Sequence, residues 1–460
     1  MLPDSFDPNA IETFRYVDAA YDDATSTATF TYALDAADTT VVTCVETYAF
    51  PRPSTPPTGS RRDAFERLLA QLFLAAGLSY YKLAAPPTVH IECGTWTIEE
   101  IAFQRRLLAK GLGEFSFVNG LEPELWPVYE YRSVAESRAP LTGLALDRGP
   151  LVPVGGGKDS CVSIEALRAA GIAPTLVTVN RYPVIQDVID DAQLPDLAVR
   201  RVLDPQLRDL NARGARNGHV PATAIVSLAV CAAAVLHGYD AVVMSNERSA
   251  SEGNVTYRGV EINHQWSKSA EAETMLRSLV AGVTPELAYF SFLRPLSELS
   301  IAQRFAATCE RYLDSFSSCN AAFRLDPARR VSRWCGQCPK CQFVYLALAT
   351  VLDRPMLRRI WGAELFGSSP VAGFEALLGL TEWKPLECVG ETRECAVALR
   401  LVREREAWRG HVVLDALATR LADEGRTATD GDVVAMLTAA TLDLSSVPSS
   451  YAYILNGVPA

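Results

Sequence analysis

The sequence predicts an α/β protein with a doubly wound parallel sheet, an N-terminal α+β domain and a helical C-terminal region. Short apolar segments alternate with helix-like segments from residue 150 to about 245. Apolar and polar side chains alternate over residues 25–50, and the chain beyond residue 350 has a helical pattern. Strands alternating with helices indicate a parallel sheet, whereas alternating side chains are typical of antiparallel strands. The expected parts are an N-terminal domain over 1–140, a central domain over 145–350 and a helical region over 351–460.

The bulk composition excludes some classes of function. The chain has 460 residues, 49% hydrophobic and 21% charged, with a net charge of −11. Such an acidic balance argues against a protein whose main partner is nucleic acid, although it leaves room for small anions. Residues 1–14 lack the pattern of a signal peptide, and the longest apolar run, 222–236, is too short to cross a bilayer. We therefore expect a cytoplasmic protein with no membrane partner, and a buried helix at 222–236.

The N-terminal pattern predicts two antiparallel strands within residues 25–50, joined by a turn at 35–38. A Pro- and Ser-rich loop follows at 51–60. An apolar stripe at helical spacing then begins at Arg61 and predicts a helix that ends near Gly77. No catalytic motif occurs in this part of the chain.

The central region predicts four parallel strands with helices between them. The strands are expected at 151–154, 174–180, 197–203 and 240–246, and the helices at 159–171, 183–193 and 223–238. Ligands bind such sheets at the carboxyl ends of the strands. Three loops are expected there, at 155–160, 180–182 and 245–247.

The loop GGGKDS combines a preceding strand, three glycines and a following helix. Such a unit presents backbone N–H groups and a helix N-terminus to an anion, most often a phosphate. The Walker pattern requires a hydroxyl residue directly after the lysine, but Asp159 follows Lys158. The dinucleotide pattern G-x-G-x-x-G is also absent. The alternative is a tight turn that is glycine-rich for structural reasons alone.

The loop resembles the SGGxDS motif of the PP-loop ATP pyrophosphatase superfamily, which would make 145–350 an ATP-binding domain. Those enzymes cleave ATP between the α- and β-phosphates and adenylate an oxygen of their substrate. The resemblance implies that the glycines wrap the pyrophosphate, that Ser160 donates to it and that the phosphates share Mg²⁺. Gly155 stands where the motif has its first serine.

The polar stretch 245–269 is long for a loop inside an α/β domain, and such loops are functional or disordered. Tyr257, Ile262 and Trp266 favour order. The stretch is therefore a candidate substrate clamp, with a solvated loop as the alternative. Its candidate substrate-binding residues are Arg248, Asn263, His264, Gln265 and Lys268.

A cysteine knuckle follows in the sequence CGQCPKC. Cys335, Cys338 and Cys341 have the spacing of metal ligands, and Cys319 lies upstream as a candidate fourth ligand. Four thiolates fit a structural Zn²⁺ site. An iron–sulfur centre, a catalytic thiol pair and a coincidence of spacing are the alternatives.

Two families share these motifs. The order of the glycine loop, PLSELS (295–300), SCN and CGQCPKC resembles that in 7-cyano-7-deazaguanine synthase over about 200 residues. Nearly the whole chain is similar to the MurL family, ATP-dependent epimerases of peptidoglycan precursor synthesis. The segments that carry this second resemblance are VPVGGGKDS, SNERSASEGN, EINHQWSKS, WCGQCPKC, KPLECVGE, GLGEFSFVNGL (111–121) and AAGLSYYKLAAPP (75–87).

The MurL resemblance implies conversion of UDP-N-acetylmuramoyl-L-alanyl-L-glutamate to the D-glutamate epimer, with release of AMP and pyrophosphate. It suggests a role for each group of candidate residues. Pyrophosphate would be held by Gly155, Gly156, Gly157, Asp159 and Ser160, with Lys158 nearby. Adenosine would lie at Asn180 and Arg181, and the α-phosphate at Ser245, Asn246 and Glu247. The candidates for catalysis are His264, Lys268, Cys388 and Asp159.

Three alternatives stay open. Cys388 has a buried core thiol as its alternative role. The chain could be another adenylating PP-loop enzyme, performing amidation or thiolation. It could also be a non-catalytic zinc-containing binding protein.

Overall fold

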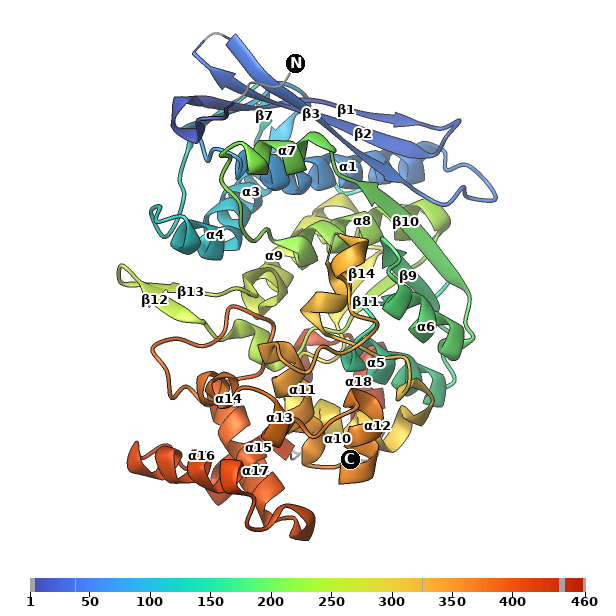
Figure 1. Cartoon of the computed structure of the whole chain (residues 1–460). Helices are drawn as coiled ribbons and strands as arrows, with labels where there is room; N and C mark the ends of the chain where they lie inside the picture. The colour runs from blue at the N-terminus through green and yellow to red at the C-terminus, as the bar shows by residue number, and fades with distance from the viewer. Residues whose placement is uncertain (1–4, 38, 325, 438–442, 458–460) are drawn as a thin grey trace.

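The computed structural model describes residues 5–37, 39–324, 326–437 and 443–457. Its centre is a ten-stranded mixed sheet in the order β14-β11-β8-β9-β10-β3-β2-β1-β4-β6 (Figure 1). The five strands at one end are mutually parallel: β8 (Pro150–Pro153), β9 (Thr175–Val179), β10 (Asp196–Val202), β11 (Ala241–Met244) and β14 (Ala288–Ser291). Starting from β8, the chain adds β9 and then β10 on one side of this strand, and afterwards β11 and β14 on its other side. This reversal confirms a doubly wound arrangement and puts its switch point between β8 and β11.

The N-terminal strands extend the same sheet. The predicted strands within 25–50 are β2 (Thr27–Ala36) and β3 (Thr39–Ala49), which pair antiparallel. The register of β3 with β10 places Tyr48 opposite Arg201 and joins the N-terminal strands to the parallel strands. The strands that were not predicted from the sequence are β1 (Thr13–Asp22), β4 (Thr88–Ile91), β5 (Trp96–Thr97), β6 (Val128–Tyr131), β7 (Val134–Ala135), β12 (Val255–Tyr257), β13 (Val260–Ile262) and β14.

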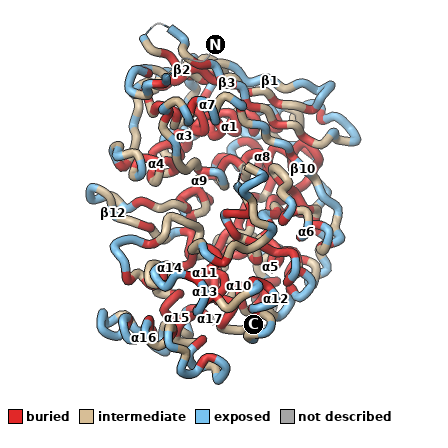
Figure 2. The backbone as a smooth tube through the Cα atoms, in the orientation of Figure 1, coloured by how far each residue is buried: buried red, intermediate tan, exposed pale blue. Residues whose placement is uncertain are grey.

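Both faces of the parallel strands are covered. Leu151 and Val242 enter a core shared with the N-terminal region, whereas Val152 and Val243 enter a core shared with the C-terminal helices. Successive side chains of a strand point to opposite faces, so β8 and β11 each contribute to both cores. Figure 2 shows many buried segments in the centre of the molecule.

The helices of the N-terminal side include the predicted ones. The helix expected from Arg61 is α1, with Gly77 directly after its last residue, and the buried helix expected at 222–236 is α8. Together α1 and α8 pack against one another beneath the N-terminal strands (Figure 1). The bounds on this side are α1 (Gly59–Ala76), α2 (Leu78–Tyr81), α3 (Ile98–Gly111), α4 (Gly113–Val118), α7 (Gln206–Ala212), α8 (Ala222–His237) and α9 (Ala270–Val283).

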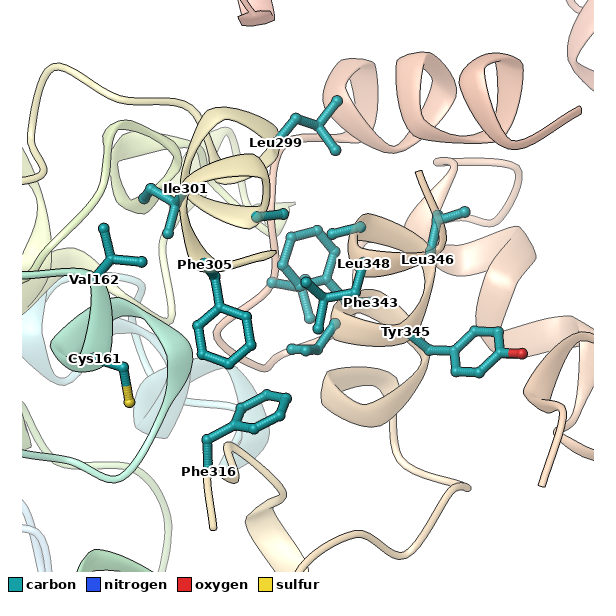
Figure 3. Packing of buried hydrophobic residues seen from close by; sticks show 14 of the residues in the cluster. Cys161, Val162, Leu299, Ile301, Phe305, Phe316, Phe343, Tyr345, Leu346 and Leu348 are labelled. Carbon is teal, nitrogen blue, oxygen red and sulfur yellow. The ribbon is translucent and has the colours of Figure 1, made fainter. Parts of the chain in front are cut away.

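The other core is formed around three helices that approach the glycine loop. Ile301 and Phe305 of α10 (Glu298–Thr308) lie between α5 (Lys158–Ala169) and α11 (Pro339–Ala349), as Figure 3 shows. Phe305 also meets Phe316 with ring centroids 4.6 Å apart. The remaining helices here are α6 (Pro183–Ala192), α12 (Arg354–Trp361), α13 (Leu365–Ser368), α14 (Val371–Leu377), α15 (Thr392–Glu404), α16 (Val412–Asp423), α17 (Asp430–Leu437) and α18 (Ser449–Gly457).

The described part of the C-terminal region after residue 350 is helical, as expected. Within the described residues, no helix combines the length and the apolar character needed to cross a membrane.

Candidate active site

The glycine loop directly follows β8 and requires a bare backbone at two positions. Gly156 has φ +80°, and its carbonyl accepts a hydrogen bond from the Ser317 N–H at 2.7 Å. A Cβ on Gly157 would lie 2.7 Å from Ser318 Oγ. The glycines therefore allow the segment at 317–318 to pack against the loop.

The loop leads into α5 without a side-chain cap, since Gly157 is the N-cap residue. The Ser160 hydroxyl donates to the Gly157 carbonyl at 3.0 Å within the first turn. An uncapped helix N-terminus beside such a loop is suited to an anion.

Lys158 points inward. Its ammonium group is buried and pairs with the carboxylates of Asp159 and Glu298, the first residue of α10. Burial opposes its charge, but the two carboxylates raise the pKa of Lys158. Glu298 lies within the PLSELS segment that carries a family resemblance, but its role could not be predicted from the sequence.

Asp159 is surrounded by cations. Burial opposes its ionisation, but Lys158, Lys340 and Lys268 lower its pKa. A buried carboxylate that remains charged beside the glycine loop connects this loop electrostatically to two more distant lysines.

Asn180 and Arg181 follow β9, and their side chains contact residues of the adjacent strand β10. Asn180 has a left-handed backbone, φ +62°, and its side-chain oxygen accepts from the Arg201 N–H at 2.8 Å. Arg181 pairs with Asp196. Both side chains therefore stabilise this edge of the sheet.

The residues after β11 lie at the switch point. Ser245 Oγ lies 2.8 Å from Ser163 Oγ of α5, and the Asn246 amide donates to Ser291 Oγ of β14 at 3.0 Å. Glu247 is buried next to them. The expected loop thus brings all three residues to the carboxyl ends of the parallel strands.

The polar stretch 245–269 is ordered as a short hairpin, β12 (Val255–Tyr257) and β13 (Val260–Ile262). Two of its candidate residues support the turn that follows: Asn263 Oδ1 accepts from the Gln265 N–H at 2.7 Å, and Gln265 Nε2 donates to the Val389 carbonyl at 3.3 Å. Arg248 lies 3.6 Å from Glu391. This stretch is therefore bound to the segment around residue 389.

His264, Lys268 and Cys388 come together, as the sequence analysis grouped them. Cys388 is half-buried, and the charges of both Lys268 and His264 act on its thiol. Burial would raise the pKa of the Cys388 thiol, but the charges of Lys268 and His264 lower it to about 6. Burial would lower the pKa of His264, but Cys388 and Glu114 raise it to about 9. Near pH 7 the pair is a thiolate beside an imidazolium.

The segment that carries Cys388 is anchored on the hairpin. Asn254 accepts from the His264 N–H at 2.8 Å with its side-chain oxygen and donates to the Pro385 carbonyl at 2.6 Å. Lys384 pairs with Glu252 at 2.5 Å. These contacts hold Cys388 against His264 although 124 residues separate them in the chain.

Glu114 and His219 border this cluster, and the sequence analysis identified neither. Glu114 of α4 accepts a hydrogen bond from His264 Nδ1. The ring of His219 lies against that of His264, with the centroids 4.4 Å apart and the planes tilted by 47°. Glu114 lies within GLGEFSFVNGL, one of the segments that carry the family resemblance, but nothing in that segment indicates a contact with His264. His219 lies in none of those segments.

The four cysteines of the knuckle converge, including Cys319. The sulfur atoms of Cys319 and Cys338 lie 4.0 Å apart, those of Cys335 and Cys341 3.7 Å and those of Cys338 and Cys341 3.5 Å. Tetrahedral zinc with bonds of about 2.3 Å would separate its sulfurs by about 3.8 Å. Backbone N–H groups also approach Cys319 Sγ and Cys335 Sγ at 3.4 Å. The donor set could bind zinc.

Lys340 connects the knuckle to the cluster. It lies between Cys338 and Cys341, and its N–H donates to the Glu387 carboxylate at 2.8 Å. The charge of Lys340 also acts on both Asp159 and Cys388. The glycine loop and the thiol are therefore parts of one electrostatic site.

Fold and site together define a doubly wound α/β protein in which a glycine loop suited to an anion lies next to a thiolate–imidazolium pair. The model of the MurL N-terminal domain matches residues 5–292, and that of the MurL C-terminal domain matches 315–432. The chain belongs to the MurL family.

Three relatives carry the name UDP-N-acetyl-alpha-D-muramoyl-L-alanyl-L-glutamate epimerase. The relative from Xanthomonas oryzae is 42% identical over 89% of this chain and 90% of its own. The relative from Micromonospora sp. is 44% identical over 88% and 90%, and that from Salinispora tropica is 43% identical over 88% of both chains.

Proposed function

We propose that this chain epimerises the terminal L-glutamate of UDP-N-acetylmuramoyl-L-alanyl-L-glutamate to D-glutamate, in the cytoplasm and for peptidoglycan synthesis. The names of the three relatives support the reaction. The observation that carries it in this chain is the Cys388–His264 pair beside the glycine loop. It offers one group that can accept a proton and one that can donate a proton.

ATP makes this proton transfer feasible. An ionised α-carboxylate makes the α-proton of glutamate very hard to remove, because a second negative charge would develop beside the first. Attack of the carboxylate oxygen on the α-phosphorus of ATP gives an acyl-adenylate and releases pyrophosphate. The activated acyl group can then carry the charge as an enolate oxyanion, which nearby donors stabilise.

The glycine loop is the proposed site of the ATP phosphates, as in PP-loop enzymes. The N–H groups of the loop and of the first turn of α5 would bind pyrophosphate, with the Ser160 hydroxyl as a further donor. Asp159 stays ionised there, and the phosphates would share Mg²⁺. Adenosine remains assigned to Asn180 and Arg181, and the α-phosphate to the loop at 245–247.

Cys388 and His264 are the proposed proton-transfer residues. The thiolate of Cys388 removes the α-proton from one face of the activated glutamate, and an acid returns a proton to the other face. The charge of Lys268 favours the thiolate, which in turn helps to raise the pKa of Lys268 and keeps it charged. Water then hydrolyses the acyl-adenylate, which gives AMP and the free D-glutamate carboxylate.

Zn²⁺ is the proposed occupant of the four-cysteine knuckle. It would be held by Cys319, Cys335, Cys338 and Cys341, whose sulfur separations fit tetrahedral coordination. A closed shell of four thiolates supplies structure and leaves no position for a substrate. Its role would be to fix the start of α11 and, with it, Lys340.

The test is an incubation with ATP, Mg²⁺ and the L-glutamyl precursor in D₂O, followed by chiral analysis of the glutamate. We expect D-glutamate with deuterium at the α-carbon, together with AMP. An amidating or thiolating enzyme would release AMP without deuterium incorporation, and a binding protein would release no AMP. Either result contradicts the proposal.

Ser160→Ala provides the matched test of the loop. Loss of one preorganised donor to a developing charge costs on the order of 100-fold, so AMP release and epimerisation should fall together. Ser368→Ala is the control, because its hydroxyl also donates to the backbone carbonyl of a helix N-cap residue, at 2.9 Å, but at an exposed position of α13. Full activity of Ser160→Ala would contradict the assignment.

A further inference from the structure

Glu114 approaches the proton-transfer pair from the N-terminal region. It is the second residue of α4, and its carboxylate accepts from His264 Nδ1. The side chains of Glu114 and His264 are each only 15% exposed, so water screens this contact weakly. The packing that permits the contact is close, since a Cβ on Gly113 would meet Ile262 of the hairpin at 3.4 Å.

A carboxylate on one ring nitrogen of a histidine fixes the tautomer and the orientation of the other. With Nδ1 donating to Glu114, the other ring nitrogen of His264 is left to serve Cys388. The carboxylate also balances the positive charge that His264 carries beside the thiolate. The same contact thus sets geometry and charge.

Two histidines share this carboxylate but differ in charge. His219 Nδ1 lies 3.8 Å from Glu114 Oε2, compared with a direct hydrogen bond for His264. Burial and the charge of His264 lower the pKa of His219 well below its ordinary value. Of the two, His264 therefore holds the proton. The other charged groups that act on these side chains are Lys82 and Lys268 at His219, and Lys268 and Lys340 at Cys388.

We propose that Glu114 is a positioning residue of the active site, which orients the His264 imidazolium toward Cys388 from the N-terminal region. The inference rests on the proposed function. It makes the site a composite of three distant parts of the chain: α4, the turn after β13 and the segment before α15. The N-terminal region would thus be required for proton transfer and not for adenylation.

The test replaces the carboxylate by its neutral isostere, Glu114→Gln. The pH dependence of Cys388 alkylation by iodoacetamide, followed by mass spectrometry of its peptide, reports the thiolate without ATP or substrate. We expect the half-point, near pH 6 in the wild type, to rise by about one pH unit as His264 loses its charge near neutrality. Exchange of the glutamate α-proton should fall about tenfold or more, with ATP consumption retained.

Two matched variants separate positioning from folding. Glu114→Asp keeps the charge and should restore the wild-type pH dependence. Glu122→Gln also removes a carboxylate that contacts the hairpin, through Arg258 at 2.7 Å, but at an exposed site, and should leave both measurements unchanged.

Three outcomes would overturn the inference. In the first, Glu114→Gln retains the wild-type alkylation profile. In the second, exchange falls with no change in its pH dependence. In the third, circular dichroism shows that neither Glu114 variant folds, which would make the residue structural. If the wild-type protein itself exchanges no α-proton, the proposed function fails, and the alkylation profiles still decide the role of Glu114.

Discussion

The glycine loop and the Glu114–His264–Cys388 cluster are built in opposite ways. The loop consists of six consecutive residues and acts mainly through its backbone and the start of α5. The cluster consists of three side chains, with 150 residues between Glu114 and His264 in the chain. A site made by the backbone of one short segment needs few contacts with the rest of the chain. A cluster of side chains from distant segments forms only when the whole chain has folded. The two halves of the reaction should therefore be separable by mutation.

The largest expected effect separates them directly. Cys388→Ala removes the proposed base, so epimerisation and α-proton exchange should fall by about 10²- to 10⁴-fold. Pyrophosphate release should persist within a few-fold, because the glycine loop is unaltered. Both are measured in one reaction, with D₂O as solvent and a coupled assay for pyrophosphate.

Cys93→Ala is the control for this variant. Cys93 is also half-buried, but burial raises the pKa of its thiol to about 11 and places no thiolate there at neutral pH. Its replacement should leave both rates unchanged. Equal loss of adenylation and exchange in Cys388→Ala would show that the two halves are not separable.

A smaller effect is expected from a substitution in the cysteine knuckle, whose Lys340 acts on both the glycine loop and Cys388. Cys338→Ser removes one of four zinc ligands next to Lys340. Loss of a structural metal is a recognised cause of severe destabilisation, so we expect a melting temperature lower by on the order of 5 °C or more. Zinc content by elemental analysis should fall with it. Full zinc content at an unchanged melting temperature would contradict the zinc assignment.

The glycine loop could be predicted from the sequence more fully than the Glu114–His264–Cys388 cluster, because the loop is local in the chain and the cluster is not. The strand, the glycines and the helix at 150–169 could be predicted, because local periodicity and turn chemistry determine them. Four of the five parallel strands and their doubly wound arrangement were predicted, whereas β14 was not. The joining of β3 to β10 could not be predicted, since a strand edge pairs with a partner that no local pattern specifies.

The cluster shows the same limit. His264, Lys268 and Cys388 could be proposed from residue type and family resemblance, whereas Glu114 and His219 could not. Glu114 lies in GLGEFSFVNGL, which carries part of the resemblance, but its contact with His264 becomes visible only when α4 is placed against the hairpin. Likewise, the sequence shows the charge of Lys158 but not that Asp159 and Glu298 neutralise it.

The smallest expected effect tests how far the loop and the cluster share one electrostatic field. In the wild type, α-proton exchange should rise with pH as the Cys388 thiolate forms near pH 6, and fall as His264 loses its proton near pH 9. Lys340→Gln removes a cation that favours the thiolate, so the pKa of Cys388 rises and the acid limb moves to higher pH. Lys340 contributes less than Lys268 or His264, so the limb should move by only a few tenths of a pH unit. The alkaline limb should stay in place, because Lys340 is not among the charges that set the pKa of His264. A profile with an unmoved acid limb would mean that the knuckle and the thiol are electrostatically independent, and the comparison would then divide the site into two.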